Sequence, residues 1–131
     1  MMKKVVLAVL AVFIAWNILD AILHGVILRN AYQQTAALWR PCAEMKMGLM
    51  RLVQLVAAIT FVAIYALLIS PKGMGAALRY GLLYGIGAGV GMGYGSYSVM
   101  PITHEIACAW FVGSLVEGIA AALLVGAIIK E

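Results

Sequence analysis

The chain has 131 residues, of which 66% are apolar and 11% are charged, with a formal net charge of +4. A soluble domain is about 45–50% apolar and about 25% charged, and a small water-soluble globule could not hide so much apolar surface. The composition therefore excludes a soluble enzyme and a disordered chain. The nine basic residues are scattered and form no stripe, which excludes a nucleic-acid partner.

Four apolar stretches have the length needed to cross a bilayer, about 20 helical residues. They lie at about residues 5–28, 46–70, 73–99 and 102–129. Only helices and closed barrels satisfy their backbone in lipid, and continuous apolar runs do not suit barrel strands. The sequence therefore predicts an all-α, integral membrane four-helix bundle that forms a single domain over residues 1–131. Its turns are short, apart from one longer loop after the first helix.

The charges at the chain ends predict an orientation in the membrane. Lys3 and Lys4 directly precede the first apolar stretch, and basic residues are enriched on the cytoplasmic side of membrane proteins. The first stretch is too long for a signal peptide and lacks a clear small-residue cleavage site, so we expect it to remain uncleaved. We predict a protein of the bacterial inner membrane with both termini in the cytoplasm.

The first stretch carries polar residues that its hydropathy would forbid. Asn17, Asp20 and His24 fall on one helical face, and Asp20 and His24 are four residues apart, so their side chains can meet. An ionised carboxylate at mid-membrane costs roughly 2.5–3.5 kcal/mol or more unless it pairs or protonates. The pair is consistent with a buried structural contact, a site that handles protons or cations, or a metal site.

The loop and the second stretch add to the same half of the membrane. Tyr32 and Trp39 predict a short helix at the interface, where amphipathic aromatic residues settle. Gln54 lies inside the second stretch, in the half next to the long loop. Arg51 either extends to the membrane surface or pairs with Asp20.

The third stretch is rich in glycine. Two series of glycines with a spacing of four residues lie on roughly opposite helical faces. The first series is Gly81, Gly85, Gly89 and Gly93, and the second is Gly87, Gly91 and Gly95. Small residues let helix backbones approach closely in a membrane. The two series therefore predict packing neighbours on both sides, within the bundle or in a second subunit, and glycine also makes a helix easier to bend.

The fourth stretch contains a second narrow polar face. Trp110, Ser114 and Glu117 share that face, and Glu117 lies near the middle of the stretch. Following the chain direction places Asp20, His24 and Gln54 in the half of the membrane next to the long loop, with Glu117 at the floor of that half. The sequence thus predicts a one-sided intramembrane polar site made of Asn17, Asp20, His24, Gln54, Ser114 and Glu117.

A weaker pattern suggests a metal. His104 and Cys108 are four residues apart at the start of the fourth stretch, with Glu105 between them, and His24 is a further candidate ligand. Several methionines near the loop would suit Cu(I). A metal ion is accordingly a possible cofactor, and a disulfide between Cys42 and Cys108 is conceivable.

These features favour a small transporter or channel that works as a homo-oligomer in the lipid bilayer. The first alternative is an accessory or assembly subunit of a larger membrane complex, and the second is copper binding or delivery. No Ser–His–Asp or Cys–His nucleophilic arrangement stands out, which disfavours an enzyme, although one acting on lipid remains an alternative.

Overall fold

The computed structural model describes residues 1–130, and this part of the chain is helical without a strand. Its long elements are α1 (Met2–Ile22), which continues as a π-helical turn (Leu23–Ile27), α3 (Met47–Leu68), α4 (Met74–Gly89) and α6 (His104–Ile128). The short elements are α2 (Arg29–Gln34), two 3-10 turns (Ala36–Leu38 and Cys42–Glu44), a second π-helical turn (Val90–Gly95) and α5 (Ser96–Val99).

The all-α prediction is confirmed, and the structure fits the prediction of a membrane protein. Three helical segments are long and apolar enough to span a bilayer: Met2–Ile27, Met47–Leu68 and His104–Ile128. The described chain has six α-helices instead of four. The difference arises because α2 forms in the loop and because a π-helical turn divides the third predicted stretch into α4 and α5. The number of spans therefore remains a prediction.

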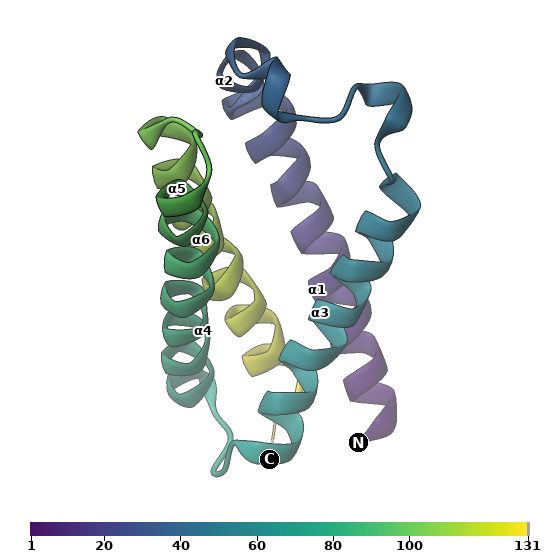
Figure 1. Cartoon of the computed structure of the whole chain (residues 1–131). Coiled ribbons are helices and arrows are strands. Elements are labelled where there is room, and N and C mark those ends of the chain that lie inside the picture. The colour runs from purple at the N-terminus through teal and green to yellow at the C-terminus, as the bar shows by residue number, and fades with distance from the viewer. Residues whose placement is uncertain (131) are drawn as a thin grey trace.

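The helix ends follow from local chemistry. Thr103 caps α6, since its hydroxyl oxygen accepts a hydrogen bond from the backbone N–H of Ile106 at 3.2 Å. The turn between α3 and α4 is held by Tyr65, whose hydroxyl donates to the backbone oxygen of Gly73 at 3.2 Å and accepts from its N–H at 3.1 Å. Both chain ends lie at the same end of the molecule as this turn, opposite α2 (Figure 1).

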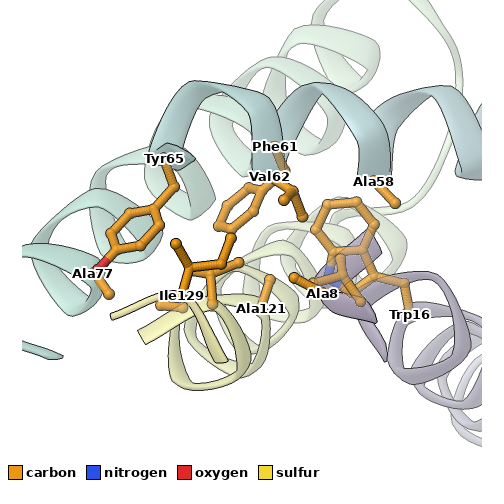
Figure 2. Close-up of a cluster of buried hydrophobic side chains, with 12 residues drawn as sticks. Ala8, Trp16, Ala58, Phe61, Val62, Tyr65, Ala77, Ala121 and Ile129 are labelled. Carbon is orange, nitrogen blue, oxygen red and sulfur yellow. The ribbon is translucent and has the colours of Figure 1, made fainter. Parts of the chain in front are cut away.

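A core of aromatic and small side chains closes the end of the molecule near the termini. It draws on α1, α3, α4 and α6, and Figure 2 shows Trp16, Phe61 and Tyr65 among its members. Phe61 stacks on Tyr80 with 4.5 Å between ring centroids, and the Tyr80 hydroxyl donates to the backbone oxygen of Phe61 at 2.7 Å. These contacts join α3 to α4 at this end.

Four glycines bring α4 and the following π-helical turn against α6. A Cβ atom added at Gly81 would meet the backbone oxygen of Gly118 and the Cβ of Ala122, and similar close contacts exist at Gly85, Gly89 and Gly93. The other series behaves differently, because a Cβ at Gly87 or Gly91 would meet nothing within 4 Å. Among residues 1–130, only one of the two glycine faces has a neighbouring helix, so the expected packing on both sides is not found there.

A second, smaller core lies at the loop end. Leu28 and Ala31, at the start of α2, pack with Ile102, Ile106 and Ala107 around the beginning of α6. This core fixes α2 across the end of the molecule. The region between the two cores is not filled by either of them.

Candidate functional site

A cavity of about 1010 Å³ lies between α1, α3, α4 and α6. Its lining runs from Trp16, Tyr84 and Glu117, beside the core near the termini, to Arg40 and Cys42 in the loop. Both loop residues are exposed, so the cavity is open at the loop end. The polar residues singled out from the sequence all line this cavity, namely Asn17, Asp20, His24, Gln54, Ser114 and Glu117.

Asp20 is at the centre of the polar contacts in the cavity. The amide nitrogen of Gln54 donates to Oδ2 of Asp20 at 2.6 Å, and Nε2 of His24 lies 3.9 Å from Oδ1. Gln54 is buried, with 8% of its surface exposed, whereas the Asp20 side chain retains 27%. Gln54 therefore orients a carboxyl group that remains accessible from the cavity.

Arg51 contacts two amide groups instead of a carboxylate. Its Nη1 donates to the side-chain oxygen of Gln54 at 3.1 Å and to that of Asn17. Asn17 in turn donates to the backbone oxygen of Phe13 at 2.8 Å, one turn earlier in α1. The expected ion pair between Arg51 and Asp20 is therefore not formed within the described residues.

His24 is linked to the loop end by a chain of hydrogen bonds. The indole N–H of Trp110 donates to the Tyr32 hydroxyl at 2.7 Å, and that hydroxyl lies 2.5 Å from Nδ1 of His24. Because indole can only donate, the hydroxyl is free to donate its own proton to Nδ1, which leaves the His24 N–H on Nε2, facing Asp20. Burial raises the pKa of the Tyr32 phenol, while the Trp110 hydrogen bond opposes that shift and nearby Asp20 adds to it.

Glu117 has an unusual environment at the floor of the cavity. Its Oε1 is buried and has no hydrogen-bond partner within the described residues 1–130. Its carboxyl group lies near that of Asp20, and a hydrogen bond between the two would require a proton on one of them. The backbone oxygen of Glu117 accepts from the indole N–H of Trp16 at 2.9 Å, which ties α1 to α6 at this level.

The residues proposed for a metal are not brought together. Nε2 of His104 lies 3.4 Å from the Tyr94 hydroxyl, and neither His104, Glu105 nor Cys108 lines the cavity that contains His24. No group of three or more His, Cys, Asp or Glu side chains suited to a metal occurs in the part of the chain that the structure describes. Cys42 and Cys108 are both free thiols.

Sequence reasoning missed the aromatic walls of the cavity. Trp16 and Tyr84 stack near the floor with 6.3 Å between ring centroids, and Trp39 contacts both Tyr32 and Trp110 near the loop, at 5.4 and 6.0 Å. All five residues line the cavity. Only Trp110 is placed by the sequence on a polar face, with Ser114 and Glu117; the positions of the other four are compatible with an ordinary core or an interfacial belt.

The site thus combines two neighbouring carboxyl groups, a hydrogen-bonded histidine and apolar aromatic walls in one cavity. Such a set brings groups that can carry protons together with apolar walls that can hold a solute. Comparison with protein families, with curated proteins and with solved structures finds no match for the chain.

Proposed function

We propose that the chain is a small proton-coupled transporter of a bacterial inner membrane, with four spans and both termini in the cytoplasm. The proposed third span is the continuous run of α4, the π-helical turn and α5 from Met74 to Val99, which is long enough for a bilayer core of about 30 Å. In this orientation the cavity opens away from the cytoplasm. Lys3 and Lys4 support the orientation through the positive-inside rule.

The observation that carries the proposal is the unpartnered oxygen of Glu117 beside Asp20. An ionised carboxylate is costly at membrane depth, and two neighbouring carboxylates repel each other, so the pair favours a bound proton or a bound cation. A solute that supplies a positive charge would take the place of the proton. This exchange is the simplest way to couple the two movements.

The charged and polar groups near Glu117 define what its protonation would sense. Asp20 on α1 and Tyr84 on α4 are its neighbours, while His24 and Arg51 line the same cavity. Arg51 is held by the amide oxygens of Asn17 and Gln54, so its charge is not spent on a direct pair with either carboxyl group. A proton on Glu117 would therefore be felt chiefly through Asp20.

A transporter is favoured over an open channel because the cavity ends at the aromatic core. Trp16 and Tyr84 form its floor, and behind them Phe61 and Tyr80 join α3 to α4. Passage needs these helices to part, which suits a mechanism in which access alternates between the two sides. The π-helical turn Val90–Gly95, with its run of glycines, supplies a place where the helix can bend.

The experiment uses proteoliposomes with a pH-sensitive dye trapped inside and valinomycin to clamp the potential. Gradients of tetramethylammonium, tetraphenylphosphonium, benzenesulfonate and benzamide serve as probes, with protein-free liposomes as the baseline. At least one probe should drive a change of internal pH in the wild type and not in Glu117→Gln. Glu105→Gln, an exposed carboxyl change on the same helix and outside the cavity, should behave as wild type.

Two results would overturn the proposal. One is the absence of any probe-driven pH change with a folded wild-type protein, and the other is an unchanged signal in Glu117→Gln. Both variants are compared at equal reconstituted amounts, and their circular dichroism establishes that they are folded.

A second candidate is a subunit of a larger membrane assembly. It is favoured by the exposed face of α4 that carries Gly87 and Gly91, where a further helix backbone could approach closely. Purification in mild detergent separates the candidates, because a protein that purifies alone, as one copy or as a homo-oligomer, argues against this second function.

A further inference from the structure

We propose that the substrate class of this cavity is a lipophilic organic cation with a single positive charge. The inference rests on the proposed transport function and names the kind of solute that the same site would take. Four properties of the cavity carry it: its size, its aromatic walls, the sign of the charge at its floor, and its opening toward the membrane.

The size suits a molecule with several rings. Pockets for drug-sized ligands measure about 300–1,000 Å³. At about 1010 Å³ the cavity lies at the upper end of that range. An inorganic ion or a small metabolite would leave most of this space to water, against walls that are largely apolar, such as Leu23, Val53 and Ala57.

The walls offer aromatic faces at two levels. Trp16 and Tyr84 stack at the floor, and Tyr32, Trp39 and Trp110 form a second group nearer the loop. Aromatic faces attract cations through their quadrupole and stack on flat apolar rings. A solute with a delocalised positive charge on an aromatic frame satisfies both preferences.

The charge at the floor is negative or neutral. Asp20 and Glu117 are neighbours there, and Oε1 of Glu117 has no hydrogen-bond donor among the described residues. A cationic group could interact with this oxygen electrostatically in place of a donor. Arg51 is exposed, and its Nη1 donates to the amide oxygens of Asn17 and Gln54, while Arg40 lies at the loop end of the cavity, away from the floor. An anionic solute would meet two carboxyl groups at the floor, so the cavity selects against it.

The cavity also opens sideways between α3 and α4. Val53 on α3 and Met92 in the turn after α4 both line it and remain 52% and 51% exposed, and Ala88 on α4 lines it and is exposed as well. In Figure 1 these two helices diverge toward the loop end. A lipophilic cation that concentrates at the membrane surface could therefore reach the floor without crossing the loop.

The test compares two probes of nearly the same shape and opposite charge, tetraphenylphosphonium and tetraphenylborate. Binding to the purified wild-type protein is measured by equilibrium dialysis against protein-free micelles of the same detergent, which removes partitioning. Quenching of tryptophan fluorescence gives a second readout, because all three tryptophans of the chain line the cavity. Tetraphenylphosphonium should bind at least about tenfold more tightly than tetraphenylborate.

The variants locate the binding site. Glu117→Gln and Asp20→Asn should each weaken tetraphenylphosphonium binding by about tenfold, while Glu105→Gln should leave it unchanged. Trp110→Leu keeps every carboxyl group and removes one aromatic wall, so it should weaken both probes through lost stacking, and tetraphenylphosphonium more than tetraphenylborate through the lost cation–π contact. Equal binding of the two probes by the wild type, or undiminished cation binding in both carboxyl variants, would overturn the inference.

The inference and the proposed function can fail separately. Charge-selective binding of tetraphenylphosphonium with no probe-driven pH change would keep the substrate class and reject proton-coupled transport. A pH change driven only by benzamide or benzenesulfonate, without binding of tetraphenylphosphonium, would keep transport and reject the organic cation.

Discussion

The contact between α4 and α6 makes a quantitative prediction for Gly81→Ala. The new methyl group would meet the Gly118 carbonyl oxygen and the Ala122 methyl group, and neither can move without shifting a helix. Overpacking of this kind costs about 1–3 kcal/mol, whereas replacing glycine by alanine inside a helix gains about 0.5–1 kcal/mol. We expect a net loss of about 1–2 kcal/mol in the free energy of unfolding.

Gly87→Ala is the matched control, because it makes the same chemical change on the opposite face of α4, where nothing lies within 4 Å. It should be neutral or slightly stabilising. The assay is unfolding in mixed micelles with increasing sodium dodecyl sulfate, followed by circular dichroism. Equal effects of the two substitutions, or a more stable Gly81→Ala protein, would refute the close helix contact.

Three further predictions concern the polar groups of the cavity. Gln54→Leu should lower the free energy of unfolding by about 1–3 kcal/mol, because Asp20 loses its donor at 2.6 Å; a variant as stable as wild type in the same assay would contradict this. Tyr32→Phe should cost about 1–2 kcal/mol at neutral pH, since the hydroxyl bonds both His24 and Trp110. Burial raises the pKa of Tyr32 in the folded state above 10.0, so this deficit should shrink as the pH rises beyond 10.0, and a deficit that stays constant there would count against the buried phenol. The membrane-soluble reagent dicyclohexylcarbodiimide should label Glu117 in preference to exposed Glu105, which peptide mass spectrometry would detect; preferential labelling of Glu105 would argue against an accessible carboxyl at the cavity floor.

The gathering of the polar residues in one cavity could be anticipated from the sequence. Asp20 and Glu117 interrupt long apolar stretches, and a charge inside a membrane helix must turn toward other helices. The direction of the chain then places Asp20 in the half next to the loop and Glu117 near the middle of the membrane. Helical periodicity adds His24 and Ser114 to the same faces, so hydropathy and spacing are sufficient for this part of the site.

The partners of these residues could not be anticipated. Arg51 can reach a carboxylate, the membrane surface or an amide oxygen, and only the relative placement of α1 and α3 decides that Asn17 and Gln54 are nearest. Tyr32 reaches His24 because α2 folds back against the start of α6, a tertiary contact that no local pattern encodes.

The glycines illustrate the same limit. A spacing of four residues predicts a face that permits close packing, and Gly81 and Gly85 have such a neighbour in α6. The pattern of Gly87 and Gly91 is equally regular, yet that face is open in this chain. Periodicity shows where a helix can approach, while the choice of neighbour depends on how the remaining side chains pack.

The position of Glu117 explains how a proton there could influence the whole bundle. Its helix, α6, is held tightly to α4 through the glycine contacts, and its backbone oxygen bonds Trp16 of α1. Its carboxyl group meets Asp20, which Gln54 connects to α3. A change of charge on Glu117 therefore acts where the α4–α6 pair meets α1 and α3, and these are the helices that must part for the proposed transporter to open its closed end.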